Sequence, residues 1–304
     1  MFSIQRIVKV IIMNKTIILA LIGYFIFSVI DLLAKQLTVN LSLYQIAGQS
    51  ALFVSLFSLI YFIVIRQISP TFNKEKVNWF IIYIFSNATN ITGLFWLLSK
   101  TTQSQIYPIL LLMPFVLPLF SFTHKGIKIP YIDFVFLTIS FMGVLLIVGF
   151  SPVFDVAIIF VTFLVMLLAS LRAYSNNQIQ GKISSVYLIV GSQLLLFILT
   201  LLIFGGGESL IVDMKSSLVV IIISFFATIA MALMIYVYTV GIPHIIAAIQ
   251  YSQLIWGALF GYIFFGERLS IEQMVGVLLV ISSGVLFALY GKKLSAKFVK
   301  KSYF

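Results

Sequence analysis

Cysteine is absent from the 304 residues, and charged side chains make up only 9% of them. Without cysteine the chain has no disulfide, no thiolate metal ligand and no cysteine nucleophile. A soluble domain carries roughly 25% charged residues, so this low fraction excludes an ordinary water-exposed surface. Most of the surface must therefore lie out of water.

Residues for metal and nucleotide chemistry are also scarce. The two histidines, His124 and His244, fall in separate short connections between apolar runs, so no histidine pair is available for a metal ion. No glycine-rich loop precedes a Lys-Ser or Lys-Thr pair, which argues against ATP hydrolysis within the chain. No set of nucleophile, base and acid stands out. We therefore predict a protein that is not an enzyme and that uses no metal or cofactor.

Hydrophobic residues dominate the chain, at 62% of the sequence, compared with about 45–50% in a soluble domain. They form runs of about 20 residues, the length of a helix that crosses a bilayer. The runs are continuous and do not alternate apolar with polar positions, which favours helices over a β-barrel. We expect an all-α polytopic membrane protein with about ten transmembrane helices. The ten runs are 17–34, 43–65, 79–98, 105–122, 131–150, 156–174, 185–204, 218–238, 245–265 and 273–290.

Basic residues set the expected orientation. The net charge is +11, but most basic residues lie in short connections or in the C-terminal segment, so they indicate topology rather than a nucleic-acid partner. With ten spans and a cytoplasmic N-terminus, 15 of the 19 Lys and Arg residues fall on the cytoplasmic side. The positive-inside rule therefore predicts a multi-pass protein of the cytoplasmic (inner) membrane with both termini in the cytoplasm.

The two halves of the chain are predicted to be repeats of one unit. Shifting the chain on itself by 141 residues overlays the first five runs on the last five and aligns Met142-Gly143-Val144-Leu145 with Ser283-Gly284-Val285-Leu286. Five is odd, so the second half enters the membrane in the opposite direction, which puts a shared binding site near the midplane. We expect two inverted-topology five-helix repeats, 14–150 and 156–291, followed by a basic cytoplasmic tail, 292–304.

The ionisable residues in or close to the spans that we take as candidates are Asp31, Lys35 and Arg172. Such side chains normally face the bundle interior or a water-filled cavity, because a charge that faces lipid is costly. The 141-residue shift places Asp31 over Arg172, so two opposite charges occupy equivalent depths. Substrate binding or gating is the functional interpretation. The alternatives are a local pair between Asp31 and Lys35, four residues apart on one helix, and snorkelling of Arg172 to the interface.

Uncharged polar and aromatic residues form a second group of candidates. The amide candidates within the spans are Gln49, Asn87, Asn90, Gln250 and Gln253, and the aromatic candidates are Trp96, Tyr174 and Trp256. The amides either line a polar cavity or join helices by hydrogen bonds. The aromatics either stack on a planar or cationic ligand or serve in packing and in the interfacial belt.

Local signals predict where some helices end or bend. Gly266 follows the ninth run and is expected to end that helix, and Ser270-x-x-Gln273 has the pattern of a capping box that opens the tenth. Span four contains Pro108, Pro114 and Pro118. These prolines are expected to kink or soften it.

The segment 247–289, AAIQYSQLIWGALFGYIFFGERLSIEQMVGVLLVISSGVLFAL, resembles the C-terminal half-signature of EamA-type permeases in the drug/metabolite transporter superfamily. Those proteins typically carry a Gly-Glu pair after the ninth span and then a glycine-rich tenth. The corresponding positions here are Gly266, Glu267, Gly276 and Gly284. The nearby Gly257-x-x-x-Gly261 permits close helix packing within one chain or between two, so the sequence leaves oligomerisation open.

The first half is similar to the same family with some departures. Segment 27–37 resembles the family's first-span ending, with Asp31 and Lys35 on its acid and lysine positions. Gln49 stands where many relatives have an arginine, and His124-Lys125-Gly126 replaces the Gly-Glu pair of the first repeat. One branch imports S-adenosylmethionine, and Asp31, Lys35 and Leu171-Arg172 are similar to that branch.

The resemblance implies a secondary transporter that moves a small polar or zwitterionic metabolite by alternating access. An amino acid, an S-adenosylmethionine-like compound or a drug-like solute would fit. The expected partners are this small molecule, the lipid bilayer and a coupling ion or exchanged solute, with no nucleic acid. Two other interpretations stay open, a membrane-embedded lipid-modifying enzyme and a non-transporting membrane assembly subunit.

Overall fold

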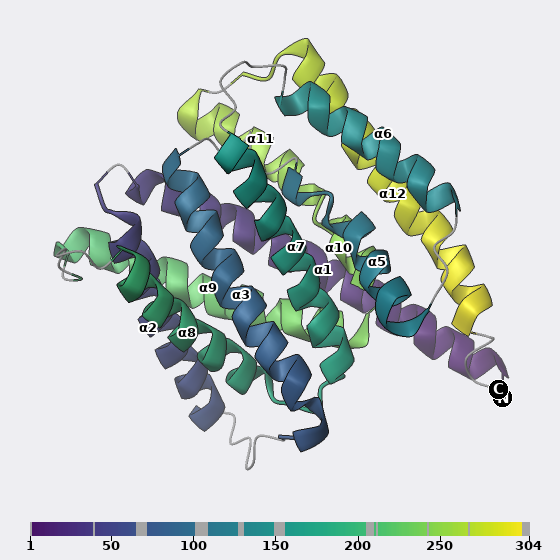
Figure 1. The fold of residues 1–304 in the computed structure, drawn as a ribbon, viewed down its shortest axis with the longest axis horizontal. Helices are drawn as coiled ribbons and strands as arrows, with labels where there is room; N and C mark the ends of the chain where they lie inside the picture. The colour runs from purple at the N-terminus through teal and green to yellow at the C-terminus, as the bar shows by residue number, and fades with distance from the viewer. Residues whose placement is uncertain are drawn as a thin grey trace.

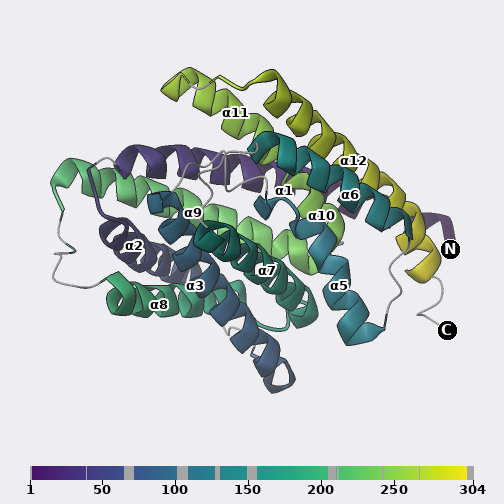
Figure 2. The ribbon, with the colours of Figure 1, turned by 45° about the horizontal axis from the view of Figure 1, so that its top comes forward.

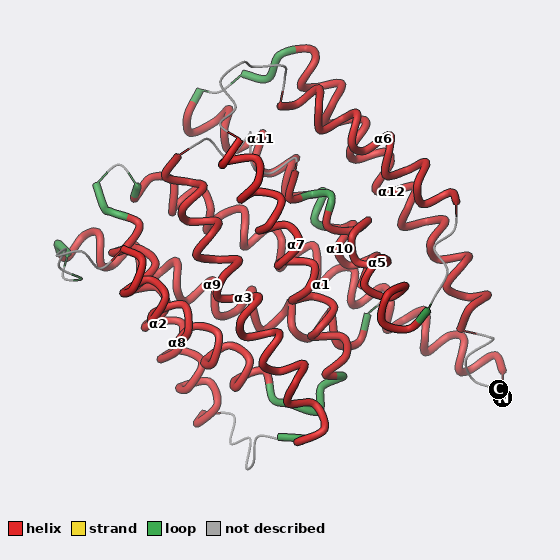
Figure 3. The backbone as a smooth tube through the Cα atoms, in the orientation of Figure 1, coloured by secondary structure: helices red, strands yellow, loops and turns green. Residues whose placement is uncertain are grey.

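The computed structural model describes residues 2–38, 40–64, 72–100, 109–126, 131–148, 156–204, 210, 212–241, 243–266 and 268–299. Within these ranges the chain is helical, and its only β-structure is one bridge between Phe72 and Ile183 (Figure 3). The all-α class predicted from the continuous apolar runs is confirmed.

The helices largely follow the predicted runs. The first half contains α1 (Phe2–Leu37), α2 (Leu43–Val64), the 3-10 helix η1 (Lys74–Lys76), α3 (Val77–Lys100), α5 (Met113–Lys125) and α6 (Tyr131–Val148). The second half contains α7 (Val156–Ile179), α8 (Ser185–Phe204), α9 (Met214–Val240), α10 (Pro243–Ile249), α11 (Ser252–Phe265) and α12 (Ile271–Val299). At the C-terminus α12 continues through most of the segment that we expected to be a separate tail.

Seven segments of the described chain are long and apolar enough to cross a membrane. They are Lys15–Leu37, Tyr44–Val64, Lys74–Leu97, Val156–Ile179, Ser185–Ile203, Met214–Val240 and Ile246–Phe265. Two shorter apolar helices, Thr138–Ile147 and Ile271–Leu286, fall on the fifth and tenth predicted spans. Large apolar side chains such as Leu202 and Leu278 are exposed along these helices. Lipid contact accounts for that exposure, so the structure supports a multi-pass membrane protein.

Helices from the two halves of the chain are interleaved. In Figure 1, α2 and α8 lie at one edge of the bundle and α6 and α12 at the opposite edge. The α6–α12 pair also lies side by side in Figure 2. Between the edges, α1 packs against α9 and α7 packs against α3. The start of α1 and the end of α12 lie at the same end of the bundle (Figure 1), as expected for an even number of crossings.

The fourth and ninth predicted spans are not continuous helices. An interruption of the fourth by its prolines was expected, whereas the break in the ninth was not predicted. Leu111 and Leu112 form a turn before α5, and Gln250 and Tyr251 form a turn between α10 and α11. Both turns use hydrogen bonds to the third residue back. The Leu112 N–H donates to the Ile109 carbonyl (3.1 Å), and the Tyr251 N–H donates to the Ala248 carbonyl (3.2 Å). Such bonds tighten the backbone into short 3-10 turns.

The two breaks have different causes. Pro114 has no N–H and its ring crowds the carbonyl four residues back, so an α-helix cannot continue smoothly from Leu110. No proline lies at the second break. There the Tyr251 ring is buried against Gly284 of α12, and a Cβ at position 284 would overlap the ring. Pro118 lies inside α5 without ending it, and Pro108 lies outside the described residues.

The ends of α11 and α12 agree with the sequence prediction. Gly266 has a φ of 65°, a left-handed conformation that suits glycine, and its N–H bonds the Gly261 and Tyr262 carbonyls. Ser270 and Gln273 form the predicted capping box, with bonds of 2.9 and 3.3 Å. The sequence analysis missed the same Ser-x-x-Gln box at the start of α2, where the two bonds are 3.1 and 3.3 Å.

Candidate functional site

A cavity of about 200 Å³ lies within the bundle. Its walls include parts of α1, α2, α3, α7, α8 and α9 and both helix breaks. The polar side chains that line it are Tyr24, Asp31, Ser50, Asn90, Arg172, Gln193, Gln250 and Gln253. Apolar residues fill much of the remaining wall, among them Phe27, Phe95, Met113, Met231 and Met234. A cavity with a mostly apolar wall and a few placed polar groups is typical of a small-molecule site. We refer to it as the central cavity.

Five residues singled out in the sequence meet at the central cavity: Asp31, Asn90, Arg172, Gln250 and Gln253. The two glutamines are there because of the second helix break. Gln250 lies in the turn, and Gln253 lies in the first turn of α11 and is 8% exposed. The turn thus places Gln250 and the start of α11 in the wall of the cavity.

Arg172 is held inside the bundle by Asn87. Its Nη1 donates to Asn87 Oδ1 at 3.1 Å, and Asn87 Nδ2 donates to Ser192 Oγ at 2.9 Å. Arg172 also borders a smaller pocket together with Tyr83 and Tyr238. A guanidinium has five N–H groups, so one bond to Asn87 leaves it able to bind an anionic group in the cavity.

Asn90 contributes both to packing and to the cavity wall. Its Nδ2 donates to the Val165 carbonyl at 2.8 Å, which joins α3 to α7. The side chain is 8% exposed and borders the central cavity. The two interpretations offered for this amide, helix packing and cavity lining, therefore hold at once.

Two buried tyrosines join α1 to α9 beside the cavity. The hydroxyl oxygens of Tyr24 and Tyr238 lie 3.0 Å apart, and the residues are 4% and 3% exposed. Asn177 Nδ2 also donates to the Tyr238 carbonyl at 3.1 Å. Tyr24 borders the central cavity and Tyr238 the smaller pocket, so their hydrogen bond lies at the boundary between the two spaces.

Three sequence candidates lie away from the central cavity. Gln49 donates to the Leu210 carbonyl and so ties α2 to the segment before α9. Trp256 packs edge-on against Phe25, with ring centroids 5.0 Å apart. Trp96 packs against the main apolar core. In the structure these side chains serve contacts between helices.

Tyr174 lies in an aromatic cluster and not at the cavity. His124 Nδ1 is 2.9 Å from the Tyr174 hydroxyl oxygen. The Trp79 ring meets the His124 and Tyr174 rings edge-on, with centroids 5.0 and 5.6 Å apart, and Phe120 completes the cluster. These contacts join the start of α3, the end of α5 and α7.

Gln193 is a cavity residue that the sequence analysis missed. It is 3% exposed, borders the central cavity and donates from Nε2 to the sulfur of Met231 at 3.4 Å. The signal was visible, because an amide in the middle of the seventh apolar run is the same kind of signal as Asn90.

The glycines of the family-like motif have different surroundings. Gly276 of α12 lies directly against Gly143 of α6, and Gly284 lies against the Tyr251 ring. Gly261 is buried, whereas Gly257 is exposed and has open space where a Cβ would stand. Close packing therefore explains Gly276 and Gly284 but not Gly257. Glu267 lies outside the described residues.

A larger hollow of about 560 Å³ runs along α8 and α9. The described residues that line it include Ser58, Tyr61, Ser184 and Thr239 but no charged side chain. The described residues also contain no group of three or more His, Cys, Asp or Glu that could hold a metal. The central cavity, with an acid and a guanidinium in its wall, is therefore the stronger candidate site.

A bundle with seven membrane-length apolar segments in its described part and an internal cavity is that of a multi-pass membrane protein. Residues 14–149 match the sequence profile of the EamA-like transporter family. This match supports a membrane transporter of the drug/metabolite transporter superfamily. It covers the first half of the chain, the half in which the sequence resemblance is looser.

Solved structures share the fold. One titled "Crystal structure of protein" superimposes with a TM-score of 0.71, covering 92% of this chain and 99% of that chain, at 12% sequence identity. In all, 28 solved chains match this structure. No curated protein matches the sequence. At such low identity the structural likeness establishes the fold and says nothing about the solute.

Proposed function

We propose that the protein is a secondary transporter that moves a small polar or zwitterionic metabolite through the central cavity by alternating access. The observation that carries this proposal is the presence of Asp31 and Arg172 in the wall of one cavity. An acid attracts a substrate ammonium group, and a guanidinium binds a carboxylate through charge-assisted hydrogen bonds. Asn90, Gln193, Gln250 and Gln253 supply uncharged donors and acceptors around the two charged groups.

Two inverted five-helix repeats would explain how the helices pair. Exchanging the halves turns the α1–α9 contact into the α7–α3 contact and returns the α2–α8 and α6–α12 pairs to themselves. The two helix breaks also correspond: a shift of 141 residues carries Leu111 and Leu112 to positions 252 and 253, two residues beyond the turn at Gln250 and Tyr251. Paired broken helices around one cavity are typical of transporters that rock about a fixed midplane site.

The rival interpretations make different predictions for ligand binding. We expect the purified protein to show a substrate-dependent rise in melting temperature with at least one zwitterionic metabolite, because ligand binding to the folded state stabilises it. The metabolites tested include amino acids and S-adenosylmethionine. A ligand present at about 100 times its Kd adds roughly 2.7 kcal/mol. The best ligand is then tested for uptake into proteoliposomes. Absence of any shift would favour an assembly subunit, and a chemically altered ligand would favour an enzyme.

The Tyr24–Tyr238 bond is expected to hold one side of the cavity closed, the cytoplasmic side in the proposed topology. Replacing Tyr24 with phenylalanine removes a hydrogen bond worth about 0.5–1.5 kcal/mol, so the open population should rise by about twofold to tenfold. The cysteine-free chain allows a direct measurement. A cysteine in place of Ala173, which borders the smaller pocket, should react faster with a maleimide in Tyr24→Phe. Tyr262→Phe, on an exposed tyrosine, is the control. Equal rates in the two variants would show that the bond does not hold the cavity closed.

A further inference from the structure

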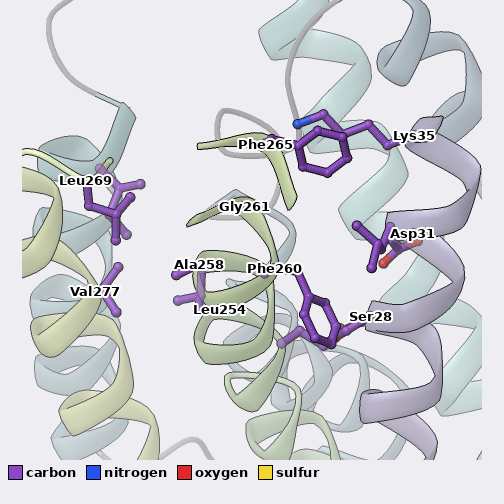
Figure 4. Close-up of a pocket in the computed structure, with 14 residues that line it drawn as sticks. Ser28, Asp31, Lys35, Leu254, Ala258, Phe260, Gly261, Phe265, Leu269 and Val277 are labelled. Atoms are coloured by element: carbon purple, nitrogen blue, oxygen red, sulfur yellow. The ribbon is translucent and has the colours of Figure 1, made fainter. Parts of the chain in front are cut away.

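A second cavity, of about 80 Å³, lies beside the central one between α1 and α11 (Figure 4). We call it the side groove. Ser28, Asp31 and Lys35 line it from α1. From α11 its wall includes the small residues Gly257, Ala258 and Gly261. Polar groups are therefore gathered on the α1 side, and the α11 side is largely apolar.

The side groove and the central cavity share two wall residues, Asp31 and Gln253. Gln253 is 8% exposed and lies in the first turn of α11, directly after the helix break. One molecule bound next to Asp31 therefore borders both spaces. The groove continues the central cavity outwards along α11, and the helix break is what positions Gln253 between them.

The floor of the groove is open because of Gly257. A Cβ at this position would meet no atom within 4 Å, so the glycine does not serve helix contact within the described chain. Small residues in membrane helices usually let another helix approach closely, but here they leave space instead. From Gln253 to Gly261 the wall extends about 12 Å at 1.5 Å per residue, about the length of an extended alkyl chain of several carbons.

The outer end of the groove is bordered by Lys35 and Phe265. The Lys35 ammonium lies 4.0 Å from the centroid of the Phe265 ring (Figure 4). This cation–π contact joins the end of α1 to the end of α11. The groove thus has a carboxylate near the central cavity, an ammonium at the far end and a narrow apolar stretch between them.

We propose that the side groove binds the apolar arm of the transported solute. The substrate is then an amphipathic zwitterion: its charged groups lie in the central cavity near Asp31 and Arg172, and its unbranched aliphatic arm lies along Gly257, Ala258 and Gly261. The proposal rests on the proposed function and deepens it. The shared wall at Asp31 and Gln253 is the reason for assigning the groove to the solute and not to a separate lipid.

The test is a chain-length series measured on two variants. The probes are straight-chain 2-aminoalkanoic acids from 2-aminobutyrate to 2-aminooctanoate. Two quantities are measured for each probe: its affinity for the protein in detergent, and its competition with the proteoliposome uptake of the best ligand from the thermal-shift screen. In the wild type we expect affinity to rise about fourfold per added methylene until the groove is filled. Gly257→Leu adds bulk to the groove, and a Cβ at this position meets no atom within 4 Å. It should bind the shortest acid normally and the longest at least tenfold more weakly than the wild type.

The matched control is Leu259→Phe, which adds bulk to an exposed position of the same helix that does not border the groove. Its affinity for the probes should rise with chain length as in the wild type. Partition of the longer probes into detergent affects both proteins equally, so this control accounts for it. If short acids bind but length has no effect, or if Gly257→Leu behaves as the wild type, the groove is not an arm subsite and a lipid chain is its occupant. If no acid of any length binds, the zwitterion transporter proposal fails together with it.

Discussion

Replacing Arg172 with alanine is expected to reduce uptake about 100-fold while leaving folded protein in the membrane. Among the described residues that line the central cavity, Arg172 is the one with a cationic side chain. A hydrogen bond between charged partners contributes about 1.5–3 kcal/mol. The variant also leaves Asn87 Oδ1 without its bond from Arg172, but Asn87 keeps its bond to Ser192. The fold should therefore tolerate the change better than transport does.

The measurement is initial uptake into proteoliposomes of the solute with the largest thermal shift, normalised to protein that runs as a single species after extraction. Arg172→Lys keeps the charge but loses the planar fork, so it should retain only part of the activity. Arg268→Ala, in an exposed connection, is the matched control and should transport normally. Unchanged uptake in Arg172→Ala would remove this residue from the mechanism.

Composition and the length of the apolar runs predicted the fold class, because both are set by the lipid bilayer that surrounds the protein and not by the details of packing. A bilayer selects continuous apolar runs of about 20 residues whatever their neighbours are. Helix ends with local signals were predictable for the same reason, as Gly266 and the Ser270 box show. The second helix break has no proline to signal it, and in the structure it lies where Tyr251 packs against Gly284, a residue far away in the sequence.

The candidate site was predicted only in part, because hydropathy does not give the rotation of a helix that is apolar on all sides. The rule that intramembrane polar groups face inward identified Asp31, Asn90 and Arg172, which meet at the central cavity. The same rule does not distinguish a cavity from a helix contact, so it also selected Gln49, which donates to the Leu210 carbonyl. Tyr174 was proposed as a ring that could stack on a ligand, and in the structure it packs in an aromatic cluster and lies within hydrogen-bond distance of His124.

The helix breaks connect the fold to the proposed transport cycle. Each break replaces α-helical bonds with shorter-range ones at the level of the cavity, so the halves of a broken span are joined more loosely than a continuous helix. Leu110 and Met113 at one break and Gln250 and Gln253 at the other all border the central cavity. Movement of one half-helix would therefore change the cavity wall directly, which is what alternating access requires.

The second large effect is expected at Gly276, where α12 crosses α6. A Cβ at this position would lie 2.6 Å from the Gly143 carbonyl oxygen, 2.7 Å from Ile147 Cγ1 and 3.0 Å from the Ile147 nitrogen. Two of these atoms belong to the backbone, so neither can rotate away and the helices must separate. We expect Gly276→Ala to destabilise the protein by about 1–3 kcal/mol, and Gly276→Leu to prevent its recovery as a single folded species.

Gly257→Leu provides the matched comparison for Gly276→Leu, because a Cβ at position 257 would meet no atom within 4 Å. Its melting temperature in detergent should stay close to that of the wild type, as for surface substitutions that change stability by less than about 0.5 kcal/mol. Gly276→Leu and Gly257→Leu carry the same added side chain, so its hydrophobicity is matched, whereas Gly276 is buried and Gly257 is exposed. If Gly276→Ala has the same melting temperature as the wild type, α6 and α12 do not touch at Gly143. The α6–α12 edge of the bundle would then have to be held by other contacts.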